Sequence, residues 1–374
     1  MGPEALLEAP ARPGSRGSRR AGRTLGTLRV LDFGAVSPVR SQSLWHALAC
    51  GVGRGSPAAL ALCRPAQPYV SLGYHRPLTD LDLETCRRRG LPVLRRLVGG
   101  GTVYLDSRQL FFQVVVPPEA VPAARSQAVA ELLGPARAAF EAAGLPADFD
   151  QGELAVAGRK VCGHGAGLVG GAVVVVGNLL ERFDAVAAAG VLWAPDVESR
   201  RRLAGRMAEC VGPDPTWPVD AQAFGEGLVS AYAEAFGVTP EPGGLTPFEE
   251  RVVRRFDRML GSPAFLRGPG GQSETQLTER RRAEIWTVKV RAGVVEARVV
   301  LDSTVLRAAL VGGRLRDVVV EDPEGDQDPG VAMALEGATE GSPALEALAR
   351  GGPSAARAAE AAARLLARAR GGGE

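Results

Sequence analysis

Short apolar runs and amphipathic segments follow one another along most of the chain, and the two patterns predict different elements. Apolar runs of about four to eight residues between turn residues are typical of buried strands. Such runs occupy residues 28–34, 58–64, 69–75, 91–98, 101–109 and 110–117. Apolar positions that recur every three or four residues predict helices. They occupy residues 37–55, 80–90, 123–144, 199–211, 220–237 and 248–260.

Two further stretches complete the pattern. Residues 153–184 place glycines between apolar runs, which predicts closely spaced hairpins. Residues 284–302 alternate apolar and polar positions, as half-buried antiparallel strands do. Strands and helices are intermixed, and no internal repeat is visible. We therefore predict an α+β fold with mixed and antiparallel sheets flanked by helices.

Changes in composition indicate where domains begin and end. Residues 1–25 are rich in Gly, Pro, Ser and Arg, which predicts a disordered basic extension. The stretch "PEPGGLTP", residues 240–247, has the composition of a linker. We expect a main domain over 26–240, a smaller C-terminal accessory domain over 248–345, and an Ala/Arg-rich helical tail over 346–374.

The overall charge and the length of the apolar runs argue against two classes of partner. The chain has 374 residues, is 45% hydrophobic and carries a net charge of +2. A nearly neutral chain gives no reason to expect a nucleic-acid partner. No apolar run reaches the roughly 18 residues of a membrane helix, so we predict no membrane partner.

Cysteine and histidine usage argues against disulfide and metal frameworks. The five cysteines are scattered and form no CxxC pair, and the chain has only three histidines. Scattered cysteines of odd number fit a reducing compartment, and we predict a cytoplasmic protein. The basic extension lacks an apolar segment and is therefore not a secretory signal, whereas an organelle transit peptide stays open as an alternative.

The segment "RRLVGGGTVYLD", residues 95–106, places three consecutive glycines between two predicted strands. Glycine weakens a strand, and its bare amides can point at one anionic group. A loose turn or bulge is the simpler interpretation. The segment is neither a P-loop, because no Lys-Ser/Thr follows the last glycine, nor a dinucleotide fingerprint, because the spacing differs.

Lysine is almost absent from this chain. Of the 44 Lys and Arg residues only Lys160 and Lys289 are lysines. Lysine is a compact point charge, whereas arginine is a broad planar fork, so a retained lysine can mark a place that needs one ammonium. Chance retention is the alternative, and for Lys289 we expect a solvated strand residue.

The order of several motifs resembles the lipoate-protein ligase and octanoyltransferase family. "SLGYH" at 71–75, "RRLVGGGTVYLD" at 95–106, "GELAVAGRKVCGHG" at 152–165 and "GNLLERFD" at 177–184 follow one another as in that family. The resemblance covers roughly residues 28–240 and implies a biotin/lipoate ligase-like catalytic domain. The C-terminal strands loosely resemble the accessory domain that many lipoate ligases carry.

The resemblance implies roles for individual residues. Lys160 matches the lysine that contacts the acyl carbonyl and the phosphate, which makes it the catalytic candidate. The residues implied to bind the acyl-adenylate are Arg96, Gly99, Gly100, Gly101, Val103, Tyr104 and Gly163. A preplaced ammonium and backbone amides would stabilise the negative charge that develops during acyl transfer.

Four residues depart from the family pattern. Leu105 and Val176 replace two of its histidines, and Gly152-Glu153 replaces its Asn-Asp pair near the metal. Glu153 is still a candidate magnesium ligand, because hard cations accept carboxylate oxygen.

The nucleophile of the related transferases is also replaced. Their cysteine lies in a Cys-Phe pair, and Asp148-Phe149 takes that place here. Strand alternation would put Cys162 on one face with Lys160 and His164, where positive neighbours would favour a thiolate. Cys162 is therefore a candidate nucleophile. In the alternative interpretation Cys162 is a small buried filler and His164 a turn residue.

We expect a lipoate-protein ligase that uses ATP and Mg²⁺ to attach lipoate or octanoate, through an acyl-adenylate, to the lysine of an acceptor domain. The expected partner is the lipoyl domain of a 2-oxoacid dehydrogenase or a glycine cleavage protein. The alternatives are ATP-independent octanoyl transfer from an acyl carrier protein through Cys162, biotin ligation, and a non-catalytic module that binds an acyl domain.

Overall fold

The structure is a computed structural model that describes residues 25–268 and 284–371. The expected basic extension lies outside the described residues except for residue 25. The chain divides into two compact units. Among the described residues, unit 1 contains 25–78, 83–183 and 212–268, and unit 2 contains 79–82, 184–211 and 284–371. The predicted α+β class is confirmed.

Unit 1 contains mostly short strands and seven described α-helices. Its strands are β1 (Leu28–Val36), β2 (Ala58–Pro65), β3 (Tyr69–Leu72), β4 (Val93–Arg95), β5 (Val103–Leu105), β6 (Gln109–Val116), β7 (Asp148–Asp150), β8 (Glu153–Val156), β9 (Arg159–Lys160), β10 (His164–Val169), β11 (Ala172–Leu180) and β12 (Pro240–Pro242). Its helices are α2 (Pro38–Val52), α3 (Leu83–Arg88), α4 (Arg125–Leu133), α5 (Ala136–Ala142), α8 (Ala221–Phe236), α9 (Pro247–Leu260) and α10 (Pro263–Arg267), and a 3-10 turn lies at Pro118–Ala120. A second 3-10 turn, Leu78–Asp80, begins at the last residue of the 25–78 segment of unit 1 and continues into unit 2.

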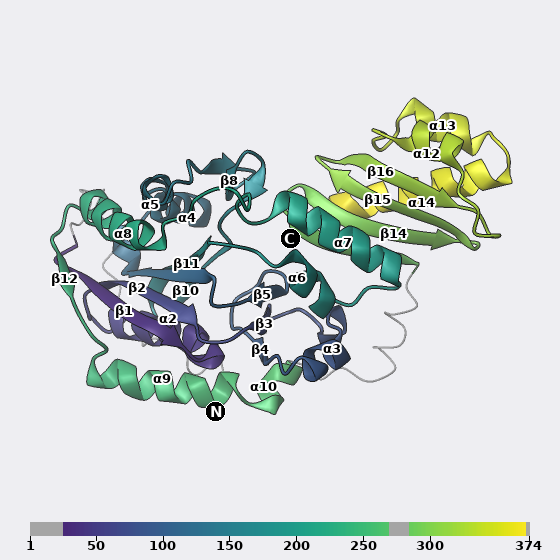
Figure 1. Cartoon of the computed structure of the whole chain (residues 1–374). Helices are drawn as coiled ribbons and strands as arrows, with labels where there is room; N and C mark the ends of the chain where they lie inside the picture. Colours follow the sequence, from purple (N-terminus) through teal and green to yellow (C-terminus); the bar gives the residue numbers. More distant parts are fainter. Residues whose placement is uncertain (1–24, 269–283, 372–374) are drawn as a thin grey trace. The chain divides into compact units, whose positions relative to one another are not determined.

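A six-stranded mixed sheet forms the centre of unit 1, with the strand order β10-β11-β6-β2-β1-β12. Alternate residues along its strands enter two separate cores because successive side chains point to opposite faces. Leu60, Phe112 and Val114 pack with α4, α5 and α8 on one face. Ala61, Val115 and Val174 pack with α2 on the other face. Helices therefore cover both faces of the sheet (Figure 1).

The stretch expected to be a linker is part of unit 1. Residues 240–242 form the edge strand β12, which pairs in parallel with β1. The following helix, α9, begins with a capping box between Thr246 and Glu249. Glu249 is completely buried and forms a 2.7 Å ion pair with Arg29 on β1. This pair attaches α9 to the central sheet.

Two small three-stranded sheets of unit 1 carry the sequence motifs. The first has the order β4-β3-β5, with the glycine segment between β4 and β5. The second has the order β7-β8-β9, and Lys160 ends its last strand. The hairpin between β8 and β9 turns at Ala157 and Gly158, which both have positive φ. These two sheets position the candidate site.

Unit 2 is built on a four-stranded antiparallel sheet in the order β13-β14-β15-β16. Its strands are β13 (Ile285–Arg291), β14 (Val294–Leu301), β15 (Thr304–Val311) and β16 (Arg314–Glu321). Its helices are α6 (Ala185–Val191), α7 (Val197–Cys210), α12 (Pro329–Leu335), α13 (Pro343–Ala349) and α14 (Pro353–Gly371). Val299 of β14 packs with Leu306 of β15 and Leu365 of α14 in the core of this unit.

Helix α7 is attached to the sheet of unit 2 mainly by charge. Arg202 on α7 lies 2.8 Å from Glu296 on β14. Asp196, which caps α7, forms ion pairs with Arg298 and Arg307. The expected domain ranges did not group α7 with the C-terminal strands, since ion pairs between distant segments leave no periodic signal. Which ranges act as catalytic and accessory domains stays a prediction.

The described helices include none that is both long enough and apolar enough to cross a membrane.

Candidate functional site

Arg96 holds the glycine segment in shape. Its Nη2 donates to the carbonyl oxygens of Gly99 at 2.8 Å and Gly101 at 2.7 Å, and its Nη1 donates to the carbonyl of Ser71 on β3 at 3.0 Å. Burial lowers the pKa of Arg96 to about 10, so its guanidinium stays charged near neutral pH. The side chain that the resemblance assigned to ligand binding thus contacts the loop, and it turns two loop carbonyls toward itself.

The middle glycine has a conformational reason to be glycine. Gly100 has φ +91°, and an added Cβ would lie 2.9 Å from Arg96 Nη2. Its carbonyl oxygen packs directly on Gly73, where an added Cβ would come within 2.0 Å of it. The glycine turn and the backbone at Gly73 therefore approach each other closely.

For the two outer glycines, Gly99 and Gly101, nothing within the chain requires glycine. An added Cβ at Gly99 or Gly101 would meet nothing within 4 Å, and neither residue has a left-handed φ. Residues 99–101 are exposed, and among the described residues their amides donate no hydrogen bond. Free amides on an exposed turn can bind anionic oxygens. The space that these glycines leave open is available to a ligand.

Lys160 forms an ion pair inside its own hairpin. Its Nζ lies 2.7 Å from Oε1 of Glu153, and the two side chains are only 20% and 13% exposed. Strand β8 begins at Glu153, and Ala155 on β8 pairs with Lys160 on β9. The carboxylate thus fixes the ammonium at one place at the end of a short strand.

Cys162 lies in the hydrophobic core. Its side chain is completely buried, and burial raises the pKa of its thiol to about 12. Strand alternation does not connect Cys162 with Lys160, because β9 ends at Lys160 and β10 begins only at His164. Residues 161–163 lie between these strands. A protonated thiol among apolar side chains fits the interpretation of Cys162 as a small filler.

His164 lies close enough to Lys160 for the positive charge of the lysine to act on its imidazole. Burial lowers the pKa of His164, and the positive charge of Lys160 lowers it further. Its Nδ1 is buried without a hydrogen-bond partner, and so is Oγ1 of Thr102 beside the glycine segment. Buried polar atoms are nearly always hydrogen-bonded. The lysine motif and the glycine motif therefore each contain one buried polar atom without a hydrogen-bond partner, which a ligand or water could supply.

A chain of buried amides connects the two motifs. Gly163 donates its backbone N–H to Oδ1 of Asn178 at 2.6 Å. Asn178 Nδ2 donates to Oε1 of Gln109 at 2.9 Å, and Gln109 Nε2 donates to the carbonyl of Tyr104 at 3.3 Å. Three hydrogen bonds thus lead from the segment after Lys160 to the strand after the glycine turn. We call these four residues, Gly163, Asn178, Gln109 and Tyr104, the amide relay.

The remaining residues implied by the resemblance lie on β5. Val103 is 40% exposed, which is unusual for a valine in a strand. Tyr104 is half-buried, and its backbone pairs with Val70 on β3. Val103 follows the last glycine of the turn by two residues, and its exposed side chain offers an apolar surface there.

The loop after α7 also holds the lysine hairpin. Gly212 donates its N–H to the carbonyl of Lys160 at 2.8 Å, and its own carbonyl accepts from Nε of Arg159 at 2.9 Å. Gly212 has φ +78°, and an added Cβ would lie 2.7 Å from Cβ of Phe183. This glycine is a contact of the site that the sequence analysis did not identify.

The residues present do not form a magnesium site on their own. The described part of the chain contains no group of three His, Cys, Asp or Glu residues that could hold a metal ion. The carboxylate of Glu153 is already engaged by the ammonium of Lys160. Glu153 as a metal ligand stays a prediction.

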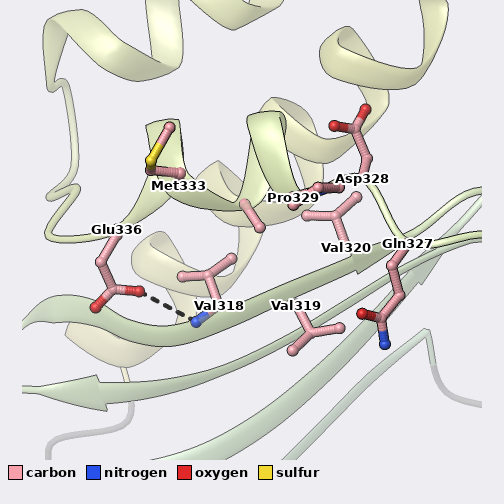
Figure 2. A pocket seen from close by; sticks show the side chains of 9 residues that line it. Val318, Val319, Val320, Gln327, Asp328, Pro329, Met333 and Glu336 are labelled. Atoms are coloured by element: carbon pink, nitrogen blue, oxygen red, sulfur yellow. Dashed lines mark hydrogen bonds between the residues drawn. The ribbon is translucent and has the colours of Figure 1, made fainter.

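The structure also contains a small hollow in unit 2. It has a volume of about 280 Å³ and lies between β16 and α12, lined by Val318, Val319, Val320, Gln327, Asp328, Pro329, Ala332, Met333 and Glu336 (Figure 2). Glu336 accepts hydrogen bonds from the amides of Asp317 and Val318. None of its lining residues belongs to a motif that the sequence singled out.

The sequence analysis did not identify Gln109, Asn178 or Gly212 as residues of the site. The side chains of Gln109 and Asn178 belong to residues only 1% and 7% exposed, although most buried strand positions are apolar. Such buried polar positions could have been flagged within the apolar runs. The partner of Asn178 lies 69 residues away along the chain, so no local pattern connects the two residues.

Comparison with known proteins agrees with the motifs. Residues 40–224 match the family model of the lipoyl protein ligase A/B catalytic domain. Octanoyltransferase LipM of Symbiobacterium thermophilum is 27% identical over 60% of this chain and 92% of its own length. Octanoyltransferase LipM of Moorella thermoacetica is 28% identical over 64% of this chain and 98% of its own length.

Solved structures share the fold. The bipartite lipoate protein ligase of Thermoplasma acidophilum, studied with its E2 lipoyl domain, matches 66% of this chain and 99% of its own with a TM-score of 0.59 and 21% identity. LipL1 of Plasmodium falciparum in complex with lipoate matches 83% of this chain and 88% of its own, with a TM-score of 0.50 and 12% identity. Through residues 40–224 the chain therefore belongs to the lipoyl protein ligase A/B family, and it is an enzyme of the lipoyl ligase or transferase kind.

Proposed function

We propose that this enzyme attaches octanoate or lipoate to an acceptor lysine through an acyl-adenylate made from ATP. The named relatives are octanoyltransferases, and two proteins that share its fold were studied with a lipoyl domain or with lipoate. Octanoyl and lipoyl groups are both acyl chains of medium length. The choice of route depends on this chain's own residues.

The burial of the cysteines is the observation that carries the ATP route. All five cysteines are thiols rather than disulfides, and the four in unit 1 are buried: Cys50, Cys63, Cys86 and Cys162. Burial raises the pKa of Cys50 to about 11 and the pKa of both Cys63 and Cys162 to about 12. Transfer through a thioester enzyme needs an accessible thiolate. An acyl-adenylate needs none.

The reaction proceeds in two balanced steps. A carboxylate oxygen of the fatty acid attacks the α-phosphorus of ATP, which forms the acyl-adenylate and releases pyrophosphate. The neutral amine of the acceptor lysine then attacks the acyl carbonyl, so that a C–N bond forms, the C–O bond to AMP breaks and the amine loses a proton. In both steps negative charge develops on oxygen.

The residues on the two motifs supply the stabilisation that these steps need. The ammonium of Lys160, fixed by Glu153, offers one positive charge to the carbonyl or phosphate oxygen. The free amides of residues 99–101 offer donors, and Arg96 fixes their direction by holding the loop carbonyls. Preorganised donors of this kind lower the barrier because they need no rearrangement during the reaction.

The extent of the chain beyond its relatives adds support. Residues outside the matched region remain after nearly the whole length of either octanoyltransferase has been aligned. The fold of Plasmodium LipL1 matches a larger share of this chain than either of them. We propose that the C-terminal sheet serves as the accessory domain of a ligase.

The proposed acceptor is a lipoyl domain of a 2-oxoacid dehydrogenase or a glycine cleavage protein. The Thermoplasma ligase was studied with its E2 lipoyl domain, which supports an acceptor of this class. The cytoplasm is the proposed location, supported by five cysteines that all remain thiols.

The second candidate is transfer of octanoate from an acyl carrier protein without ATP. The names of the two octanoyltransferase relatives favour it. Because the thiols of unit 1 are buried, this route would require either opening of the core at Cys162 or direct attack by the acceptor amine on the carrier thioester.

Pyrophosphate exchange separates the two candidates. The enzyme is incubated with ATP, Mg²⁺, labelled pyrophosphate and either octanoate or lipoate. We expect acid-dependent incorporation of label into ATP. Absence of exchange with both acids, together with octanoylation of a lipoyl domain from octanoyl carrier protein, would replace the ligase by the transferase. If the protein binds a lipoyl domain but catalyses neither reaction, it acts as a binding module.

A further inference from the structure

Gln109 and Asn178 are diagonal neighbours on adjacent strands. In the register of β6 and β11, Gln109 lies opposite Leu180 and Asn178 lies opposite Phe111. Diagonal residues on one face of a sheet can touch when their side chains are long enough. An asparagine and a glutamine satisfy this condition, and their amides meet at 2.9 Å.

The side chain of Asn178 accepts a backbone hydrogen bond that a strand carbonyl would otherwise accept. Its backbone N–H donates to the carbonyl of Gly163 at 3.1 Å, and its Oδ1 accepts the N–H of Gly163 at 2.6 Å. Two residues further along, the N–H of Leu180 donates to the carbonyl of Val161 at 3.1 Å. Asn178 therefore fixes Gly163 from both sides, in a segment that belongs to neither β9 nor β10.

The relay has a direction that fixes both side-chain amides. Since the N–H of Gly163 can only donate, Asn178 must present its oxygen there and its nitrogen to Gln109. Gln109 must then present its oxygen to Asn178 and its nitrogen to the carbonyl of Tyr104. Reversing either amide would place like groups together. A buried network that is satisfied in only one arrangement specifies a unique geometry.

We propose that Gln109 and Asn178 are positioning residues that set the distance between Lys160 and the glycine turn. The relay ends three residues after the lysine, at Gly163, and three residues after the last glycine, at Tyr104. It thus fixes the two motifs to one another across β11 and β6. This inference rests on the proposed function, because the fixed distance matters when both motifs hold one acyl-adenylate.

Gln109→Glu breaks the relay at one atom. The carboxylate can still accept from Asn178 Nδ2 but cannot donate to Tyr104. Gln113→Glu is the matched control, because Gln113 is equally buried on the same strand and its Nε2 donates to the carbonyl of Ser41, outside the relay. Any general effect of a buried carboxylate is common to the two variants.

The test compares both variants by kcat, KM for the fatty acid, and hydrogen exchange of residues 161–164 in the full chain. We expect Gln109→Glu to lower kcat about tenfold with little change in KM, because misplaced groups weaken transition-state contacts first. We also expect faster exchange at 161–164, two hydrogen bonds away. Gln113→Glu should change neither quantity. If the two variants change kcat and the exchange at 161–164 equally, the proposal is overturned.

Two additions keep the test decisive. If Gln109→Glu does not fold, Asn178→Thr replaces it, because threonine can accept from Gly163 but is too short to reach Gln109. If the wild-type enzyme acylates nothing, the proposed function fails, and the exchange comparison alone decides the relay. Faster exchange in Gln109→Glu only would support it, and unchanged exchange would refute it.

Discussion

The Nζ atom of Lys160 lies 2.7 Å from Oε1 of Glu153. Both residues belong to one hairpin, and both side chains are largely shielded from water. A lysine held in this way has one place to act. An ammonium on a freely rotating side chain would instead occupy many positions. The pair thus connects one of the two lysines of the chain to a defined position beside the segment of Cys162 and His164.

Lys160→Arg should abolish most activity and leave the fold intact. Arginine keeps the charge and the pairing with Glu153, but its planar fork cannot occupy the position of a compact ammonium. We expect kcat to fall about a hundredfold or more, as for loss of one preplaced donor, with a thermal midpoint close to that of the wild type. Lys289→Arg, at an exposed strand position, is the matched control and should be fully active. Unchanged turnover in Lys160→Arg would remove Lys160 from the site.

Glu153→Gln distinguishes a lysine partner from a metal ligand. Glutamine retains an oxygen for Lys160 Nζ but loses the charge, so we expect kcat to fall about three- to tenfold, as for a weakened charge-assisted hydrogen bond. The concentration of Mg²⁺ that gives half-maximal activity should stay the same. A large increase in that concentration would instead make Glu153 a metal ligand.

Alanine substitutions in the glycine turn should separate folding from binding. Gly100→Ala places a side chain in a left-handed backbone and against Arg96, and we expect a loss of about 1–2 kcal/mol of unfolding free energy. Gly101→Ala meets nothing within the protein, so its stability should stay within about 0.5 kcal/mol of the wild type. We expect Gly101→Ala to lower activity all the same, because its methyl group enters the space proposed for the ligand. Wild-type KM and kcat in Gly101→Ala would place the ligand elsewhere.

Cys162 should behave as a core residue. Because burial raises the pKa of its thiol to about 12, native protein treated with iodoacetamide at about pH 8 should remain unmodified at Cys162. Cys210, which is partly exposed, serves as the internal reference. Cys162→Ala should retain kcat while losing about 1–2 kcal/mol of stability from the lost burial. A stable octanoyl thioester on Cys162 would contradict this assignment and favour the transferase.

Local patterns predict most elements of the fold. The pattern over 123–144 predicts a pair of helices, or one helix kinked near Pro135, and the structure has two helices, α4 and α5, that meet there. Strands β15 and β16 lie outside the predicted ranges. Residues 240–247 resemble a linker because Pro and Gly dominate them, but an edge strand tolerates proline, and β12 pairs with β1. Contacts between distant segments, such as Arg29 with Glu249, leave no mark in a local pattern.

The candidate site was predictable where its chemistry is local. The glycine turn and Lys160 are visible as motifs, and the structure gives each a defined geometry. The clamp formed by Arg96 and the partner position at Gly73 depend on how β3 brings β4 and β5 together. The amide relay depends on the register between β6 and β11. Its members are ordinary residues in sequence, and only the pairing of strands brings them into contact.

The most direct measurement is a crystal structure of the enzyme with a non-hydrolysable octanoyl-adenylate analogue. We expect the oxygens that surround its acyl and phosphate centres to lie within hydrogen-bond distance, about 3 Å, of both Lys160 Nζ and the backbone amides of residues 99–101. An analogue bound with Lys160 turned away from it, or outside the glycine turn, would contradict the proposal that these two motifs together hold the activated acyl group.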